Sequence, residues 1–104
     1  MPTTTIEGHT IIVNEEGFLT EPSEWSEELA GVLAAQIGLE LTEEHWRAIR
    51  FVRDDFAHTG DTATLRRLAV VGHIPTKSMF RLFPQKPAKK LAYVAGLPKP
   101  HGCV

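Results

Sequence analysis

The chain of 104 residues contains one cysteine, Cys103, which stands one residue from the C-terminus. A single cysteine excludes a disulfide within the chain and the disulfide framework of many small secreted proteins. No apolar run is long enough to span a bilayer, so we expect no membrane partner. The first residues, MPTTTIEGHTIIV, lack the basic start and apolar stretch of a secretory signal. These absences favour a reducing compartment, and we predict a cytoplasmic protein.

Acidic residues are absent from residues 62–104, which hold eight bases and therefore carry a net charge of +8. Residues 1–61 hold all 13 acids and three bases, a net charge of -10. Such asymmetry between halves indicates an anionic partner for the basic half. The alternative is that the two halves attract each other within the fold, and both interpretations can hold.

The length and the apolar content of 42% fit a single domain covering residues 1–104. Weak alternation through Ile6, Ile11 and Val13, around turn-prone glycines, predicts a small N-terminal β-hairpin. From Ser23 onward the apolar residues recur at helical spacing. The predicted fold class is mainly α (α+β), with about five helices, the small hairpin and a flexible C-terminal arm.

Capping and breaking residues give the bounds of the predicted helices. The first runs from Ser23 to Gly38, the second from the N-cap Thr42 to near Gly60, the third from a cap at Asp61 or Thr62 to Gly72, the fourth over 76–83, and the fifth from Pro87 to Gly96. Pro98 and Pro100 exclude further helix because each lacks an amide donor. Residues 97–104 are therefore predicted to form an extended, partly mobile arm that carries Cys103.

Cys103 is the first candidate for chemistry, because a thiol at a chain end is exposed and reacts as the thiolate. Lys99 and His101 favour the thiolate, whereas the C-terminal carboxylate of Val104 opposes them. A thiol on a stiff arm with a loose tip suits a carrier that moves a group between enzymes. The alternative is an accidental tail cysteine without a function.

Two groups of basic residues are candidates for binding surfaces. A docking patch beside the arm is expected from Arg81, Lys86, Lys89, Lys90 and Lys99. The helices over 62–72 and 76–83 also resemble a helix-turn-helix, as any two adjacent short helices do. In that pair, candidates for DNA or RNA contact are Arg66, Arg67 and Lys77. The alternative for both groups is a solvated helix face.

Metal binding is not predicted. His101 and Cys103 are too few donors, and the other four histidines show no ligand spacing. We therefore expect no metal site and no other cofactor.

The C-terminal stretch RLFPQKPAKKLAYVAGLPKPHGCV (81–104) resembles the signature of the DsrC/TusE/DsvC sulfur-relay family, with its LFP, PAK and AGLPKP motifs and a penultimate cysteine. Residues 15–30 and 41–56 resemble further segments of that family. The resemblance implies helices with an N-terminal β-hairpin and a flexible C-terminal arm. It also implies that Cys103 accepts sulfane sulfur as a persulfide and passes it on.

Two departures from the family pattern bear on function. Family members that serve dissimilatory sulfite reductase carry a second cysteine ten positions earlier, where this chain has Tyr93. TusE-like members keep only the penultimate cysteine and relay sulfur toward 2-thiouridine in tRNA. The stretch over 70–80 is also several residues shorter than in many members, so contacts made there differ.

The leading hypothesis is a sulfur-relay carrier, a sulfurtransferase-type protein rather than a stand-alone enzyme. Its expected partners are a donor sulfurtransferase and an acceptor protein, in tRNA thiolation or in sulfur oxidation. The alternative is a regulatory or nucleic-acid-binding protein that uses the basic half to contact tRNA or DNA. A third hypothesis is a plain interaction subunit with an idle thiol. The sequence indicates no oligomeric state.

Overall fold

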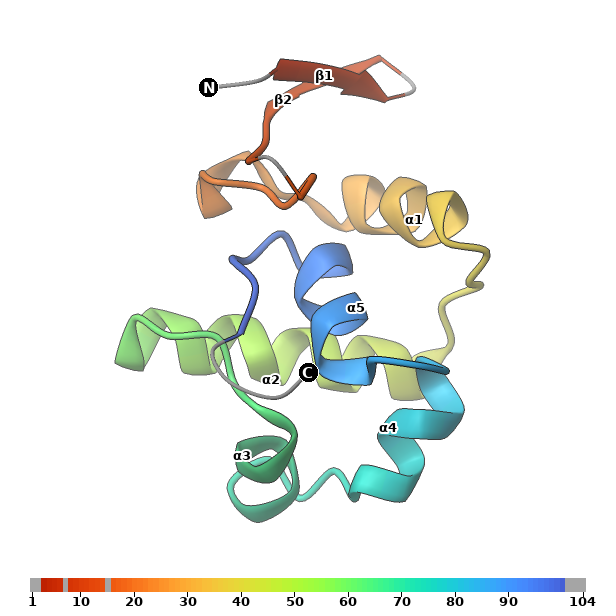
Figure 1. Ribbon diagram of the computed structural model, residues 1–104, viewed down its shortest axis with the longest axis vertical. Coiled ribbons are helices and arrows are strands. Elements are labelled where there is room, and N and C mark those ends of the chain that lie inside the picture. Colours follow the sequence, from red (N-terminus) through yellow and green to blue (C-terminus); the bar gives the residue numbers. More distant parts are fainter. Residues whose placement is uncertain (1–2, 7, 15, 101–104) are drawn as a thin grey trace.

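The computed structural model describes residues 3–6, 8–14 and 16–100, so Cys103 lies outside the described residues. A β-hairpin lies over the first helix, and the last helix occupies the centre, between the first helix and the long second one (Figure 1). The described α-helices are α1 (Glu27–Gln36), α2 (Glu43–Thr59), α3 (Leu65–Val70), α4 (Thr76–Leu82) and α5 (Pro87–Val94). The predicted class, mainly α with a small hairpin, is confirmed. None of these helices is both long and apolar enough to cross a bilayer.

The hairpin consists of β1 (Thr3–Ile6) and β2 (His9–Ile12), paired antiparallel in register. The chain then turns through a loop in which Asn14 Oδ1 accepts hydrogen bonds from the backbone amides of Glu16 and Phe18. This Asx-type turn is the reason the loop closes tightly at that point. The β-hairpin predicted from the sequence is therefore confirmed.

Helix α1 begins later than the sequence predicts. Pro22–Glu24 forms a separate 3-10 turn, and the N-cap of α1 is Ser26, whose hydroxyl accepts from the Leu29 amide. The predicted start at Ser23 is wrong, and Trp25 lies before the helix. Its indole Nε1 donates to the Val94 carbonyl at 2.9 Å. A long-range hydrogen bond thus overrides the local helical pattern.

Helix α2 begins after Thr42, as predicted, with a capping box completed by His45. His45 is buried, and its Nδ1 accepts from the Thr42 amide. The proton is therefore on Nε2, which donates to the Leu82 carbonyl at 2.9 Å and ties α2 to the end of α4. The helix ends at Gly60, where φ is 79°, a conformation that glycine adopts without strain.

Helix α3 also begins later than predicted. Its N-cap is Thr64, whose hydroxyl accepts from the Arg67 amide. The predicted caps at Asp61 or Thr62 are wrong, since the Thr62 hydroxyl instead donates to the Pro98 carbonyl at 2.7 Å. The true cap lies two residues beyond Thr62 because the C-terminal segment competes for that side chain.

The core gathers around α5. Fully buried side chains of the larger cluster come from every helix, for example Ala34, Ile49, Leu68, Met79 and Leu91. A smaller cluster packs the hairpin and the following loop onto α1, with members Ile11, Val13, Leu19, Leu29 and Leu33. Each large apolar side chain buried in this way contributes about 1.5–3 kcal/mol to stability. The C-terminal end of α5 is therefore fixed inside the fold.

Candidate functional site

The base of the predicted arm is packed against the body. The structure describes residues 97–100 of this segment, and within them Leu97 is 1% exposed and Pro100 is buried. The hydroxyl of Thr62 donates to the Pro98 carbonyl at 2.7 Å, which anchors the segment beside the start of α3. The described part of the arm thus leaves the domain from a defined position.

Two side chains satisfy carbonyl groups at the C-terminal end of α5. Trp25 Nε1 donates to the Val94 carbonyl, and Arg53 Nη1 donates to the Ala95 carbonyl at 2.7 Å. The Arg53 guanidinium also stacks over the Trp25 ring, 4.1 Å from its centroid. Helix ends leave carbonyls without intrahelical partners, so these contacts stabilise the end of the helix.

Gly96 turns the chain out of α5 with φ at 70°. A Cβ at this position would lie 2.5 Å from the Trp25 ring, closer than any real contact. Burial lowers the pKa of the Arg53 guanidinium, while the Ala95 carbonyl and the Trp25 ring compensate for its partial loss of water. The arm therefore departs from a rigid junction formed by Trp25, Arg53 and Gly96.

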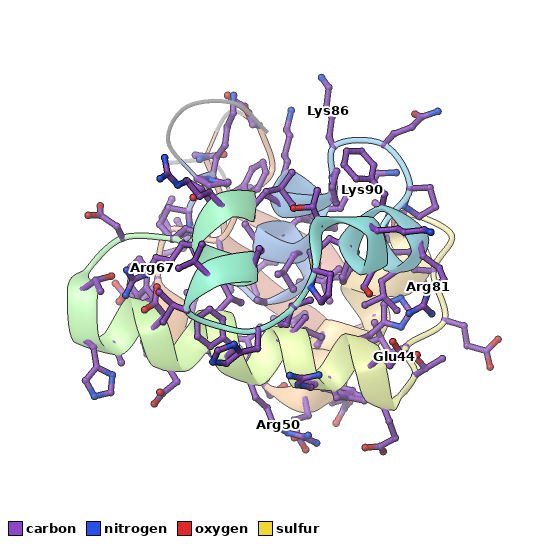
Figure 2. All side chains as sticks on the ribbon, turned by 90° about the horizontal axis from the view of Figure 1, so that it is seen from below. Glu44, Arg50, Arg67, Arg81, Lys86 and Lys90 are labelled. Atoms are coloured by element: carbon purple, nitrogen blue, oxygen red, sulfur yellow. The ribbon has the colours of Figure 1, made fainter. Side chains whose placement is uncertain are left out.

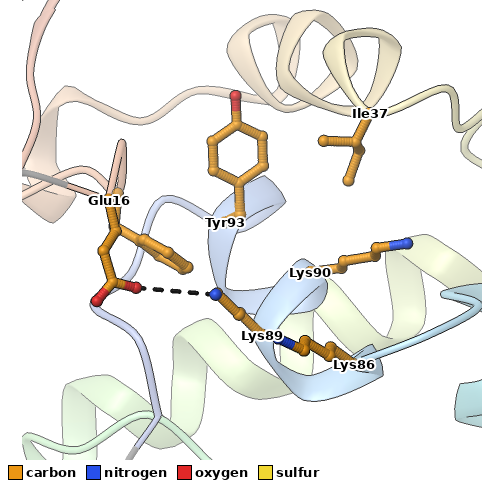
Figure 3. A pocket seen from close by; sticks show the side chains of 7 residues that line it. Glu16, Ile37, Lys86, Lys89, Lys90 and Tyr93 are labelled. Atoms are coloured by element: carbon orange, nitrogen blue, oxygen red, sulfur yellow. Dashed lines mark ion pairs between the residues drawn. The ribbon is translucent and has the colours of Figure 1, made fainter.

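Three of the five predicted docking residues line one groove. Lys86, Lys89 and Lys90 stand around an apolar floor in a groove of about 280 Å³ beside α5 (Figure 3). The floor consists of Phe18, Ile37 and Tyr93, and the groove is also lined by Glu16. Phe18 and Tyr93 pack edge to face, with ring centroids 6.0 Å apart. Burial raises the pKa of the Tyr93 phenol, so its hydroxyl stays neutral at physiological pH.

The other predicted docking residues have acidic partners. Lys99 and Lys89 share the carboxylate of Glu16, at 3.5 and 3.8 Å. Arg81 forms two hydrogen bonds with Glu44 of α2, away from Lys86 and Lys90 of the groove (Figure 2). Those hydrogen bonds and the charge of Arg81 lower the pKa of the Glu44 carboxyl. Arg81 therefore contributes to the junction of α2 and α4 rather than to the groove.

The candidate nucleic-acid contacts lie in different environments. Arg67 is held by Asp55, with Nε and Nη2 donating to the two carboxylate oxygens at 2.8 and 2.7 Å. This hydrogen bonding, followed by the charge of Arg67, lowers the pKa of the largely buried Asp55 carboxyl. Arg66 and Lys77 are exposed on α3 and α4. Attraction between the acidic and basic halves, the simpler of the two interpretations, thus accounts for Arg67, Arg81, Lys89 and Lys99.

Within the described residues, no three His, Cys, Asp or Glu side chains come close enough to hold a metal ion. The functional chemistry predicted from the sequence depends on Cys103, which lies outside these residues.

Sequence reasoning missed the residues that fix the arm junction and the floor of the groove. Trp25 was expected on a helix and Thr62 was considered as a cap, whereas both bind carbonyls of the C-terminal segment. Phe18 and Ile37 approach Tyr93 only in the folded chain. Gly96 was the one sign of the arm junction in the sequence, since a glycine directly after a helix marks a left-handed turn.

Comparison with known proteins assigns the chain to the family that its sequence resembles. The family model described as DsrC like protein matches residues 5–104. Sulfurtransferase TusE of Escherichia coli (strain K12) is 40% identical to this chain over 105 residues, covering 94% of this chain and 96% of that one.

Solved structures of similar proteins share the fold. The NMR structure of Allochromatium vinosum DsrC superposes with a TM-score of 0.82 at 39% identity, covering 98% of this chain and 97% of that one. The oxidized gamma-subunit of the dissimilatory sulfite reductase (DsrC) from Archaeoglobus fulgidus gives a TM-score of 0.77 at 38% identity, covering 99% of this chain and all of that one. The resemblance found in the sequence is thereby confirmed.

Proposed function

This chain belongs to the family of DsrC like proteins, and from that membership we propose that it is a sulfurtransferase of a sulfur relay. We place the sulfur on Cys103, the only thiol in the chain, which falls inside the segment matched by the family. That match over residues 5–104 is the observation that carries the proposal. Relatives of similar length named Sulfurtransferase TusE support it.

The proposed reaction is a transfer of sulfane sulfur without net oxidation. The Cys103 thiolate attacks the outer sulfur of a donor persulfide, a new S–S bond forms, and the donor's S–S bond breaks. The donor leaves as a thiolate, and Cys103 holds the sulfur as a persulfide. The reverse exchange with an acceptor nucleophile returns the Cys103 thiolate, so the protein is a carrier in the overall sequence.

The arm junction supports this function. Cys103 is the third residue after Pro100, and three extended residues span at most about 10 Å. The thiol is thus tethered near a rigid point of the body, held by Trp25, Arg53 and Thr62. A short tether keeps a group near a docked partner at high effective concentration.

The single thiol also limits the ways in which the sulfur can leave the protein. With Tyr93 in place of a second cysteine, the chain cannot close an internal disulfide, so the sulfur must leave to another molecule. We therefore favour a TusE-like relay toward 2-thiouridine in tRNA, in the cytoplasm, with a sulfur-oxidation complex as the other acceptor class.

The test is intact-mass measurement of the reduced protein after incubation with a small-molecule persulfide donor. We expect a gain of one or more sulfur atoms that reductant reverses, and no gain in the variant Cys103→Ser. Loading of the Cys103→Ser variant to the same extent would overturn the proposal, and so would an unmodified wild-type protein with several donors.

A second candidate function is nucleic-acid binding by the α3–α4 pair, supported by the exposed Arg66 and Lys77. Its third residue, Arg67, is already engaged by Asp55. Binding of tRNA or duplex DNA that weakens with salt and is lost in the variant Arg66→Glu/Lys77→Glu would support it. Binding insensitive to these two residues would exclude this surface.

A further inference from the structure

Resting on the proposed relay function, we propose that the lysine groove is the docking site for an acidic segment of a relay partner protein that carries one apolar or aromatic side chain. The lysine groove is defined by Lys86, Lys89 and Lys90 at its rim and by Phe18, Ile37 and Tyr93 at its floor. The partner's apolar side chain would occupy the floor, and its carboxylates would pair with the lysines.

The size and lining of the groove fit a side chain better than a whole cofactor. Its volume of about 280 Å³ lies at the lower limit of small-molecule sites, which span about 300–1,000 Å³. The three floor residues come from separate elements, namely the loop after β2, the end of α1 and α5. Phe18 is buried, and Ile37 and Tyr93 are partly buried side chains that pack against the core, so the fold holds the floor in place. A well-packed apolar pocket is the usual place for an interface anchor.

The rim already shows how a carboxylate is held. Glu16 lies 3.8 Å from Lys89 (Figure 3) and 3.5 Å from Lys99, and both distances are beyond the range of a good hydrogen bond. Ion pairs of this length on half-exposed side chains are weak, so an incoming carboxylate can replace Glu16. Glu16 therefore occupies the place that we assign to a carboxylate of the partner.

The backbone is strained at Gln85 and Lys86, where Lys86 reaches the rim of the groove. Among the described residues, only three other than glycine have positive φ, and two of them are Gln85 (φ 60°) and Lys86 (φ 46°). Lys90 braces this link by donating to the Pro84 carbonyl. Left-handed backbone at residues with a Cβ is unfavourable and concentrates at functional positions. Lys86 is exposed there, and within the described part of the chain it has no acidic partner.

A protein segment suits the groove better than RNA. Nucleic acids require a continuous basic surface, whereas the labelled Arg50, Arg67 and Arg81 lie on other sides of the molecule from Lys86 (Figure 2). Arg67 and Arg81 of the basic half are also hydrogen-bonded to Asp55 and Glu44 of this chain. The apolar floor gives no advantage to a phosphate backbone but favours an apolar side chain.

A second copy of the chain is a poor occupant. Three of its most exposed large apolar side chains, Val70, Val71 and Phe80, belong to the basic half and would bring cations to a lysine rim. The groove also lies beside the arm, since Lys99 shares Glu16 with Lys89. A partner seated in the groove is therefore next to the origin of the segment that bears Cys103.

The probe for this proposal is a blocked synthetic peptide of sequence Glu-Asp-Phe-Asp-Glu, titrated into the reduced full-length protein and followed by backbone amide shifts in NMR. We expect shifts at Phe18, Ile37 and Tyr93. Reversal of two rim charges in Lys86→Glu/Lys89→Glu should weaken binding about tenfold, whereas the matched pair Arg66→Glu/Lys77→Glu should leave it unchanged. Glu16→Gln should strengthen binding about twofold to threefold, and Asp54→Asn, an equal change of net charge on the exposed side of α2, should not.

Four results would overturn the proposal. The first is the absence of amide shifts at millimolar peptide, and the second is shifts that remain unchanged in Lys86→Glu/Lys89→Glu. The third is equal binding of a peptide with Gly in place of Phe. The fourth is tighter binding of an oligouridine at the same lysines. None of these measurements involves sulfur, while the persulfide mass measurement involves no peptide. Failure of the groove is therefore distinguishable from failure of the carrier function.

Discussion

At the scale of single residues, the exit of the arm depends most directly on Gly96. Its φ of 70° and the position of the Trp25 ring exclude a Cβ without a shift of either the backbone or the indole. The indole in turn binds the Val94 carbonyl and stacks under Arg53, which binds the Ala95 carbonyl. One absent methyl group thus allows three contacts that hold the end of α5.

We predict that Gly96→Ala lowers the free energy of unfolding by about 2–5 kcal/mol, the sum of left-handed strain and overpacking. The control is Gly31→Ala in α1, where no atom lies within 4 Å of the new Cβ. That substitution should raise stability by about 0.5–1 kcal/mol because alanine is the better helix former. Urea unfolding measures both, and equal effects of the two substitutions would contradict the account.

At the scale of elements, the link between α4 and α5 combines strain with a binding role. Lys86 is the N-cap of α5 and has φ 46° and ψ 57°. A left-handed residue with a Cβ costs about 1–2 kcal/mol, part of which glycine avoids. The link therefore keeps a lysine at a position where backbone energetics favour glycine.

We predict that Lys86→Gly raises the free energy of unfolding by up to about 1 kcal/mol. Lys86→Ala removes the same charge but keeps the Cβ, so its stability should stay close to that of the unmodified chain. Both variants should bind the acidic peptide more weakly. Denaturant unfolding of the two variants separates backbone strain from charge, and a stabilised Lys86→Ala would show that charge repulsion, not strain, governs this link.

At the scale of the whole molecule, the acidic and basic halves are joined by ion pairs. Asp55 and Arg67 form one of these pairs, and the side chain of Asp55 is only 7% exposed. The pKa of Asp55 is lowered in the fold, so this carboxylate stabilises the protein above its unfolded pKa. The contribution is lost as the pH falls through the still lower folded pKa.

We therefore predict that Asp55→Asn is less stable than the unmodified chain at pH 7 and that the difference shrinks below about pH 4, the ordinary range of an aspartate. Urea unfolding at pH 7 and pH 3 measures the difference. Asp54→Asn, on a side chain that is 77% exposed, should show little effect at either pH. A difference for Asp55→Asn that stays constant with pH would contradict the role assigned to this ion pair.

Local signals in the sequence predicted most elements of the fold but not its long-range contacts. Thr42, Gly60 and Pro87 mark helix ends whose capping requires only neighbouring residues, and these predictions are confirmed. Ser23 and Thr62 were assigned wrongly because Trp25 and Thr62 bind carbonyls of the C-terminal segment, 69 and 36 residues away in the chain.

The same distinction applies to the candidate site. Cys103 could be proposed from the sequence because its position and its motif are local features, and its role stays a prediction. Only the lysines of the groove were predicted from the sequence. Its lysines lie close together in the sequence, at the N-cap and in the first turns of α5, but its floor requires Phe18 and Ile37, which the fold brings to Tyr93 from distant segments. The acidic partners of Arg67 and Arg81 could likewise not be predicted, because the packing of α2 brings those carboxylates to them.

Loading of the protein with sulfur, followed by unloading, shows whether Cys103 carries sulfur that it can release. The protein is treated with a persulfide donor, separated from it, and exposed to cyanide, which removes sulfane sulfur as thiocyanate. We expect thiocyanate release, return of the intact mass to that of the reduced chain, and neither effect with Cys103→Ser. Absence of thiocyanate from the wild-type protein, or equal release from Cys103→Ser, would contradict the claim.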